Sequence, residues 1–149
     1  MDINRFTEKA QEALSAAQSK AIRASHQQVD VEHLLSALLE QERGLAASIL
    51  TRAGAPVDVL KRRVEQELER LPRVSSPSGG ADQVYITGRL NRTLTQAEDE
   101  AKRLKDQYLS VEHLLLAMLE DGGATGRLFK ELGVTRDRLM QALQEIRGS

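Results

Sequence analysis

The stretch Val29-Asp-Val-Glu-His-Leu-Leu-Ser-Ala-Leu-Leu-Glu40 decides the fold, because it occurs twice. Eighty positions later the chain reads Leu109-Ser-Val-Glu-His-Leu-Leu-Leu-Ala-Met-Leu-Glu120. The same offset relates matching residues upstream of both stretches, such as Thr7 and Thr87. Identities at a fixed spacing over most of the chain indicate a tandem duplication.

The composition is that of a helical domain with an aliphatic core. The chain has 149 residues, no Cys and 3% aromatic residues, which excludes disulfides and thiolate metal sites. Its 21 basic and 22 acidic residues are evenly spread, whereas a nucleic-acid partner would need a basic face. No apolar run approaches the roughly 18 residues of a membrane span, and the first residues lack a secretory signal. We therefore expect a cytoplasmic protein with neither a nucleic-acid nor a membrane partner.

Apolar residues at helical spacing predict four helices in each copy. In the first copy these helices cover about 7–24, 31–40, 44–53 and 57–71, and the second copy repeats them at about 87–105, 110–120, 124–132 and 135–147. No segment alternates as a strand would. The predicted fold is all-α, with eight helices.

The two copies are expected to share one core. Repeat one covers about 1–71, a Pro/Ser/Gly-rich linker about 72–83, and repeat two about 84–147. A half of this size is marginally stable alone. We therefore predict a single globular domain of two pseudo-twofold-related repeats over residues 1–149, with independent halves on a tether as the alternative.

Enzymatic motifs are missing from the sequence. There is no phosphate-binding glycine loop, nucleophile elbow or zinc-protease motif, and three His residues are too few and too scattered for a zinc site. His33 and His113 are expected to pack in the first turn of their helices. We predict no catalytic residue, no metal ligand and no cofactor, and hence no enzyme.

The duplicated polar residues at helix starts have two interpretations. Thr7 and Thr87 fit N-caps, and Glu32 and Glu112 fall in the first turn behind Asp30 and Ser110, where a helix favours a carboxylate. They can simply stabilise the helices. They can also frame a binding groove between the repeats.

Five segments carry a family resemblance. They resemble the amino-terminal Clp repeat domain, most closely in its ClpB branch, and the resemblance covers essentially all 149 residues. They are Phe6-Thr-Glu-Lys-Ala-Gln-Glu-Ala-Leu14, the doubled Val-Glu-His-Leu-Leu, Leu71-Pro-Arg-Val74, Lys105-Asp-Gln-Tyr-Leu109 and Glu131-Leu-Gly-Val-Thr-Arg-Asp-Arg-Leu139.

The resemblance implies a domain that engages substrate for an ATP-dependent disaggregase chaperone of the stress response. Such a parent would be a homohexameric AAA+ protein that uses ATP and magnesium and works with the DnaK chaperone system. The domain alone would be a monomer that weakly binds unfolded or aggregated polypeptide. The resemblance places the polar part of the binding surface at Thr7, Asp106 and Glu112, and nearby apolar positions could line the groove. These are Leu90, Leu94, Tyr108 and Leu109, with Glu32 and Thr87 as a second, symmetric set.

The related ClpC and ClpA branches suggest an alternative function. Their domains dock adaptor proteins, and in ClpC the glutamates at the positions of Glu32 and Glu112 recognise phosphoarginine. The ClpC flanking pattern Gly-Thr-Glu-His-Ile-Leu differs from Asp30-Val-Glu-His-Leu and Ser110-Val-Glu-His-Leu here. We expect Asp106 and Glu112 to be partly exposed, and Asp106 to contribute little to stability.

Overall fold

Eight α-helices form the part of the chain that the computed structural model describes, residues 2–74 and 84–148. The first repeat contains a 3-10 turn, four helices and a short strand. They are η1 (Ile3–Arg5), α1 (Glu8–Arg23), β1 (Gln28–Val29), α2 (Val31–Glu40), α3 (Leu45–Arg52) and α4 (Val57–Glu69). The second contains β2 (Tyr85–Ile86), α5 (Gly88–Arg103), α6 (Val111–Met118), α7 (Ala124–Glu131) and α8 (Arg136–Arg147). The prediction of an all-α fold with eight helices is confirmed.

The two short strands are a departure from the sequence prediction, which contained none. β1 and β2 pair in parallel, with Gln28 opposite Tyr85 and Val29 opposite Ile86. A strand of two residues is too short to show an alternating pattern, so hydrophobic periodicity could not predict it. This pairing joins the loop between α1 and α2 of the first repeat to the start of the second repeat.

Side chains and glycines at the helix ends explain why the helices start and stop where they do. The hydroxyls of Thr7 and Thr87 accept hydrogen bonds from the N–H groups of Ala10 and Leu90, as expected for N-caps. Gly54 follows α3 at φ 86° and Gly133 follows α7 at φ 77°, a backbone conformation that favours glycine. These local signals set the same helix boundaries in both repeats.

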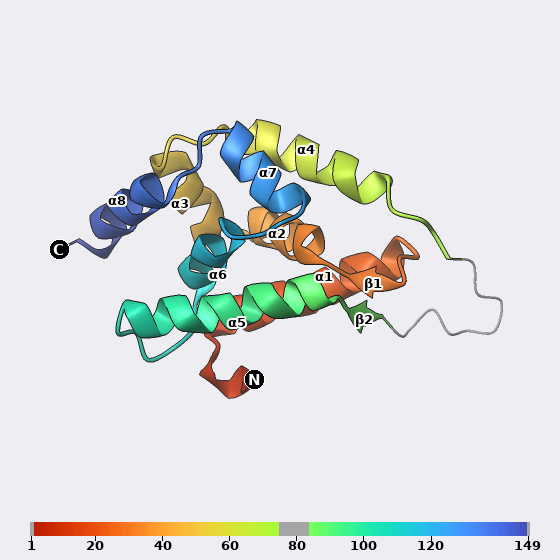
Figure 1. Ribbon diagram of the computed structural model, residues 1–149, viewed down its shortest axis with the longest axis horizontal. Helices are drawn as coiled ribbons and strands as arrows, with labels where there is room; N and C mark the ends of the chain where they lie inside the picture. Colours follow the sequence, from red (N-terminus) through yellow and green to blue (C-terminus); the bar gives the residue numbers. More distant parts are fainter. Residues whose placement is uncertain (1, 75–83, 149) are drawn as a thin grey trace.

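The helices of the two repeats are interleaved around one core. In Figure 1, α2 and α6 lie between the long helices α1 and α5 on one side and the shorter helices α3, α4, α7 and α8 on the other. Each short third helix packs against the last helix of the other repeat, α3 on α8 and α7 on α4. Contacts of α2 with α7 and of α6 with α3 follow the same exchange. This reciprocity is the packing expected of a pseudo-twofold relation.

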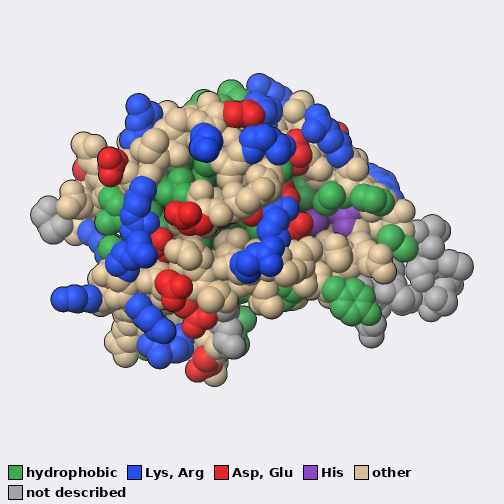
Figure 2. All heavy atoms as spheres, viewed as in Figure 1, with side chains coloured by type: hydrophobic (Ala, Val, Ile, Leu, Met, Phe, Trp, Pro, Cys, Tyr) green, Lys and Arg blue, Asp and Glu red, His purple; other side chains and the backbone are tan. Residues whose placement is uncertain are grey.

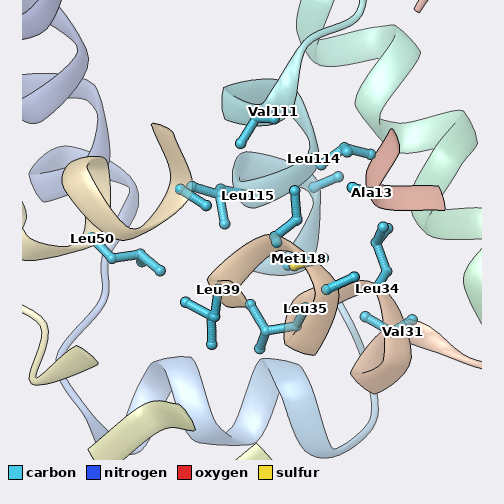
Figure 3. Packing of buried hydrophobic residues seen from close by; sticks show 14 of the residues in the cluster. Ala13, Val31, Leu34, Leu35, Leu39, Leu50, Val111, Leu114, Leu115 and Met118 are labelled. Atoms are coloured by element: carbon cyan, nitrogen blue, oxygen red, sulfur yellow. The ribbon is translucent and has the colours of Figure 1, made fainter. Parts of the chain in front are cut away.

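The repeated sequence forms the centre of that core. Leu34 and Leu35 of α2 and Leu114 and Leu115 of α6 are completely buried in one cluster of apolar side chains, together with Met118 (Figure 3). Burying a Leu side chain contributes about 1.5–3 kcal/mol. Both repeats therefore contribute buried side chains to one shared core.

Most of the expected linker at about 72–83 lies outside the described residues, which stop at Val74 and resume at Val84. The Val74 N–H donates to the carbonyl of Ser25 at 2.8 Å. The end of the first repeat is thereby held against the loop that follows α1.

Candidate functional site

Two equivalent loops lead into the central helices. We call residues 24–30 the first connecting turn and residues 104–110 the second connecting turn. Each has one residue at positive φ, Ser25 at 60° and Lys105 at 59°. Each also touches the opposite repeat. The N–H of Thr7 donates to the carbonyl of Leu109 at 2.9 Å, and that of Thr87 donates to the carbonyl of Val29 at 3.1 Å. The N-terminal segment of each repeat therefore lies beside the connecting turn of the other.

A histidine in the first helical turn closes each connecting turn. The Asp30 N–H donates to Nδ1 of His33 at 2.9 Å, and the Ser110 N–H donates to Nδ1 of His113 at 2.9 Å. Both imidazoles are buried, which confirms the prediction that they pack in the first turn. Because Nδ1 accepts in both rings, Nε2 is the nitrogen that carries the proton.

The partner of this Nε2 differs between the repeats. His113 Nε2 lies 2.8 Å from a carboxylate oxygen of Asp106, whereas His33 Nε2 lies 2.9 Å from Nδ1 of His26. Burial, reinforced by the charge of His26, lowers the pKa of His33 to about 4. Burial and the charge of Arg73 also lower the pKa of His26. The His26–His33 pair of the first repeat is therefore uncharged near neutral pH, whereas the Asp106–His113 pair of the second repeat contains a carboxylate.

In the second repeat an arginine joins the two predicted carboxylates. The guanidinium of Arg147, on the last residue of α8, donates to Asp106 and to Glu112, each at 2.9 Å. Glu112 also accepts from the Ser110 hydroxyl. Burial acts to raise the pKa of both carboxyls, but hydrogen bonds from Ser110 and Arg147 to Glu112, and from His113 and Arg147 to Asp106, outweigh it and lower the pKa. Both groups are carboxylates at neutral pH.

In the first repeat a different arginine holds the equivalent glutamate. Arg89 of α5 donates to Glu32, to Asp30 at 3.0 Å and to Asp121 at 2.7 Å. Glu32 also accepts from the N–H and the hydroxyl of Thr125 at 3.0 and 2.7 Å. Burial acts to lower the pKa of Arg89, but the hydrogen bonds to Asp121 and Glu32 raise it. This cluster joins α2, α5 and α7 across the repeats.

The structure brings Thr7, Asp106 and Glu112 to one region. Thr7 hydrogen-bonds the second connecting turn, which contains Asp106, and Arg147 bridges Asp106 to Glu112. Asp106 is partly exposed as predicted, but Glu112 is buried, with 9% of its surface exposed. The prediction of partial exposure is wrong for Glu112, because Ser110 and Arg147 cover its carboxylate.

Three of the four apolar candidates belong to the core. Leu90, Leu94 and Leu109 are buried, so they are not surface residues that could line a groove. α5 packs its apolar face on α6, and Leu109 lies beside Phe6 in a bridge between the backbones. Tyr108 is 52% exposed. In the second, symmetric set, the Thr87 hydroxyl donates to Asp30 at 2.8 Å and Glu32 is buried.

The expectation that Asp106 contributes little to stability assumed a loop carboxylate without partners, and the structure gives it two. Its carboxylate binds the buried imidazole of His113 and pairs with Arg147. Arg147, Arg89 and Asp121 were missed by sequence reasoning. The carboxylates that the two arginines contact lie 32 or more positions away in the chain, and the residue matching Arg89 in the first copy is Lys9. No local pattern could have identified them.

Three further observations concern nucleic-acid, metal and membrane ligands. Basic and acidic side chains are interspersed on the face shown in Figure 2. Among the described residues, no group of three or more His, Asp or Glu side chains is placed to hold a metal ion. Over residues 2–74 and 84–148, no helix is long and apolar enough to cross a membrane.

Comparison with known proteins identifies the family. The Clp repeat (R) N-terminal domain family matches residues 5–132. The chain belongs to this family, which places it among chaperone-related domains and not among the ATPase modules of such proteins. It is 42% identical to the chaperone protein ClpB of Nitratidesulfovibrio vulgaris over 151 aligned residues, with all of this chain and 18% of that protein covered. ClpB of Bacillus anthracis is also 42% identical, with all of this chain and 17% of that protein covered. The chain therefore spans less than a fifth of the length of these relatives.

Solved structures show the same fold. The Hsp104 N-terminal domain from Candida albicans has a TM-score of 0.80 and 27% identity, with 97% of this chain and 92% of that chain covered. A complex of the ClpV N-domain with a VipB peptide has a TM-score of 0.74 and 23% identity, with 95% of this chain and 86% of that chain covered. At that identity the likeness to ClpV shows the fold alone.

Proposed function

We propose that this chain is the substrate-engaging domain of a ClpB-type ATP-dependent disaggregase. It binds unfolded or aggregated polypeptide weakly and passes it to an ATPase ring formed by other parts of a longer, cytoplasmic protein. That protein would be a homohexamer that uses ATP and magnesium and cooperates with the DnaK system. The family and the similarity to ClpB over the whole chain support this proposal.

The observation that carries the proposal is the convergence of Thr7, Asp106 and Glu112 at the second connecting turn, which also contains the exposed Tyr108. An exposed aromatic ring next to carboxylates suits recognition of apolar and polar parts of a non-native chain together. Aromatic residues contribute much of the energy at binding surfaces. We define the recognition surface as Thr7, Asp106, Tyr108 and Glu112.

Arg147 gives a physical reason for weak binding. Its guanidinium already satisfies both carboxylates, so a polypeptide must displace it to reach Glu112. The Arg147 side chain is 38% exposed and lies on the last residue of α8, so displacement requires little rearrangement. Weak binding at each site is sufficient when a tether and several copies raise the effective concentration.

Titration with casein, an unfolded polypeptide, tests the proposal. Glu112→Gln removes the charge and should weaken binding several-fold, whereas the matched variant Asp58→Asn should not. Asp58 is an exposed carboxylate in the first turn of α4, so it shares the helix-start position but lies outside the recognition surface. Arg147→Gln should strengthen binding, because it frees both carboxylates. Casein binding that is equal in all four proteins would place the recognition surface elsewhere.

The same titration separates the alternatives. If the domain binds a folded adaptor but neither casein nor other unfolded chains, the adaptor-docking function of the ClpA and ClpC branches is favoured. Phosphoarginine recognition has less support, because Glu32 and Glu112 each already hold an arginine of the chain itself. Binding of free phosphoarginine that Glu112→Gln abolishes would favour it.

A further inference from the structure

A cavity of about 310 Å³ opens beside the first connecting turn, away from the recognition surface. It lies among the C-terminal ends of α1 and α4 and the start of α2. The imidazoles of His26 and His33 form part of its wall, and Ala24 and Leu68 supply apolar surface. The cavity therefore combines polar groups with an apolar face, as small-ligand sites commonly do.

A chain of hydrogen bonds directs one donor into this cavity. Because the Asp30 N–H donates to Nδ1 of His33, Nε2 of His33 carries a proton and donates to Nδ1 of His26. The remaining nitrogen of His26, Nε2, must then carry its own proton. His26 is 7% exposed, and no described residue accepts a hydrogen bond from this Nε2–H. The nitrogen itself is not fully buried, so its N–H is available to an acceptor on a ligand in the cavity.

The charges around the cavity favour an anion. Lys20 from α1 is paired with Glu40 at 2.6 Å, and Glu65 from α4 accepts from the Ser36 hydroxyl at 2.5 Å. Arg23 from α1 and Arg73 after α4 form no ion pair within the described residues. Glu69 is the one acidic residue of the cavity wall that has no such partner among the described residues. Asp30 on the α2 side is engaged by Arg89. The unpaired charge facing His26 is therefore positive.

The second repeat shows the complementary arrangement. Asp106 occupies the position that corresponds to His26, and it presents an acceptor that holds a guanidinium. His26 presents a donor in the same place, flanked by arginines. The two connecting turns therefore differ in the charge of the group that they can bind, which is positive at the second turn and negative at the first.

We propose that this cavity binds a carboxylate of a polypeptide, with His26 Nε2–H, Arg23 and Arg73 as donors and with Leu68 against the apolar part of the ligand. This site is separate from the recognition surface and does not depend on the function proposed for it. The Nε2–H is already present on the neutral imidazole, because Nδ1 of His26 accepts from His33. The carboxylate is therefore bound without uptake of a proton.

The experiment uses N-acetyl-leucine as a chain-terminal carboxylate and N-acetyl-aspartate α-amide as a side-chain carboxylate. N-acetyl-leucine amide is the uncharged control. The NMR signals of the His26 ring should shift saturably with a carboxylate and stay fixed with the amide. A larger response to the leucine compound identifies a chain terminus, and a larger response to the aspartate compound identifies an acidic side chain. No saturable shift with either carboxylate, or an equal response to the amide, would overturn the proposal.

A pair of arginine variants localises the binding. Arg73→Gln should weaken carboxylate binding about tenfold, the loss of one charge-assisted hydrogen bond. Arg70→Gln should leave it unchanged, because Arg70 lies three residues away and pairs with Glu67 outside the cavity. Both arginines are exposed, so neither change disturbs the core. Equal affinities in the two variants would contradict the assignment of Arg73.

Discussion

The two connecting turns are copies of one loop that now have different chemistry. Both begin with a residue at positive φ and both close on a buried histidine. His26 gives the first turn a pair of neutral imidazoles, whereas Asp106 gives the second a carboxylate, an imidazole and the guanidinium of Arg147. Both turns keep the positive-φ residue and the capping histidine, while the exchange of His26 for Asp106 changes the group that the buried histidine contacts.

The arginines that hold Glu32 and Glu112 differ in a similar way. Arg89 lies in the long helix α5 and contacts three carboxylates between the repeats. Arg147 lies at the end of α8 and contacts two. We interpret the Arg89 cluster as an ion-pair cluster that stabilises the packing of the two repeats. We interpret the Arg147 cluster as one that a ligand can displace. The difference between them predicts how each should respond to mutation.

The largest expected effect is the loss of Arg89. Arg89→Ala leaves Asp30, Glu32 and Asp121 without their shared cation, and breaking a buried charge cluster of this kind costs about 3–5 kcal/mol. Urea unfolding measures this loss. Arg92→Ala, an exposed arginine one turn along α5, should change stability by under about 0.5 kcal/mol. If Arg147→Ala proves as destabilising as Arg89→Ala, the distinction between a stabilising Arg89 cluster and a displaceable Arg147 cluster is wrong.

Acid should destabilise the first connecting turn before the second. The folded pKa of His33 lies below its value in the unfolded chain, so protonation favours unfolding. Stability is therefore full above about pH 6.5 and falls as the pH drops toward about 4, by up to about 3 kcal/mol. Glu112 and Asp106 have lowered pKa values, so their contribution persists in this window and is lost below about pH 4.

His26→Asp provides the matched control for this pH dependence. It gives the first turn the carboxylate of the second, which should raise the pKa of His33 and reduce the loss of stability between about pH 6.5 and 4. Thermal melts across this range measure the slope. An unchanged slope in His26→Asp would show that the histidine pair is not its source.

Loss of Asp106 should have a smaller effect. Asp106→Ala removes the acceptor of the buried His113 Nε2–H and one partner of Arg147, and should cost about 1–2 kcal/mol. Asp106→Asn keeps a hydrogen-bond acceptor and should recover part of that loss. Chemical denaturation of the two variants gives the comparison. A fully stable Asp106→Ala would show that the contact with His113 contributes nothing.

The smallest expected effect on stability is at Tyr108. The ring is exposed, so Tyr108→Ser should change stability by under about 0.5 kcal/mol while it weakens casein binding. Tyr85→Ser is the matched control, because Tyr85 is also exposed but lies in β2 beside the first connecting turn. Equal losses of casein binding in both variants would mean that the two ends of the molecule bind alike.

The sequence by itself determined the features that depend on residues close together in the chain. Helices, their caps at Thr7 and Thr87, and the burial of His33 and His113 follow from local spacing and capping. The duplication also predicted that both repeats adopt one fold. These features are encoded within one helical turn or one period of the repeat, so they can be read without knowing how the helices pack.

Only the tertiary structure decided which residues meet across the repeats. Arg89 and Arg147 reach Glu32 and Glu112 because α5 and α8 pack where they do, and no spacing in the chain encodes that contact. For the same reason Leu90, Leu94 and Leu109 fill the core while Tyr108 stays exposed. Periodicity shows that a helix has an apolar face, but the choice between core and groove depends on which helix covers that face, and this is fixed only when the two halves pack together.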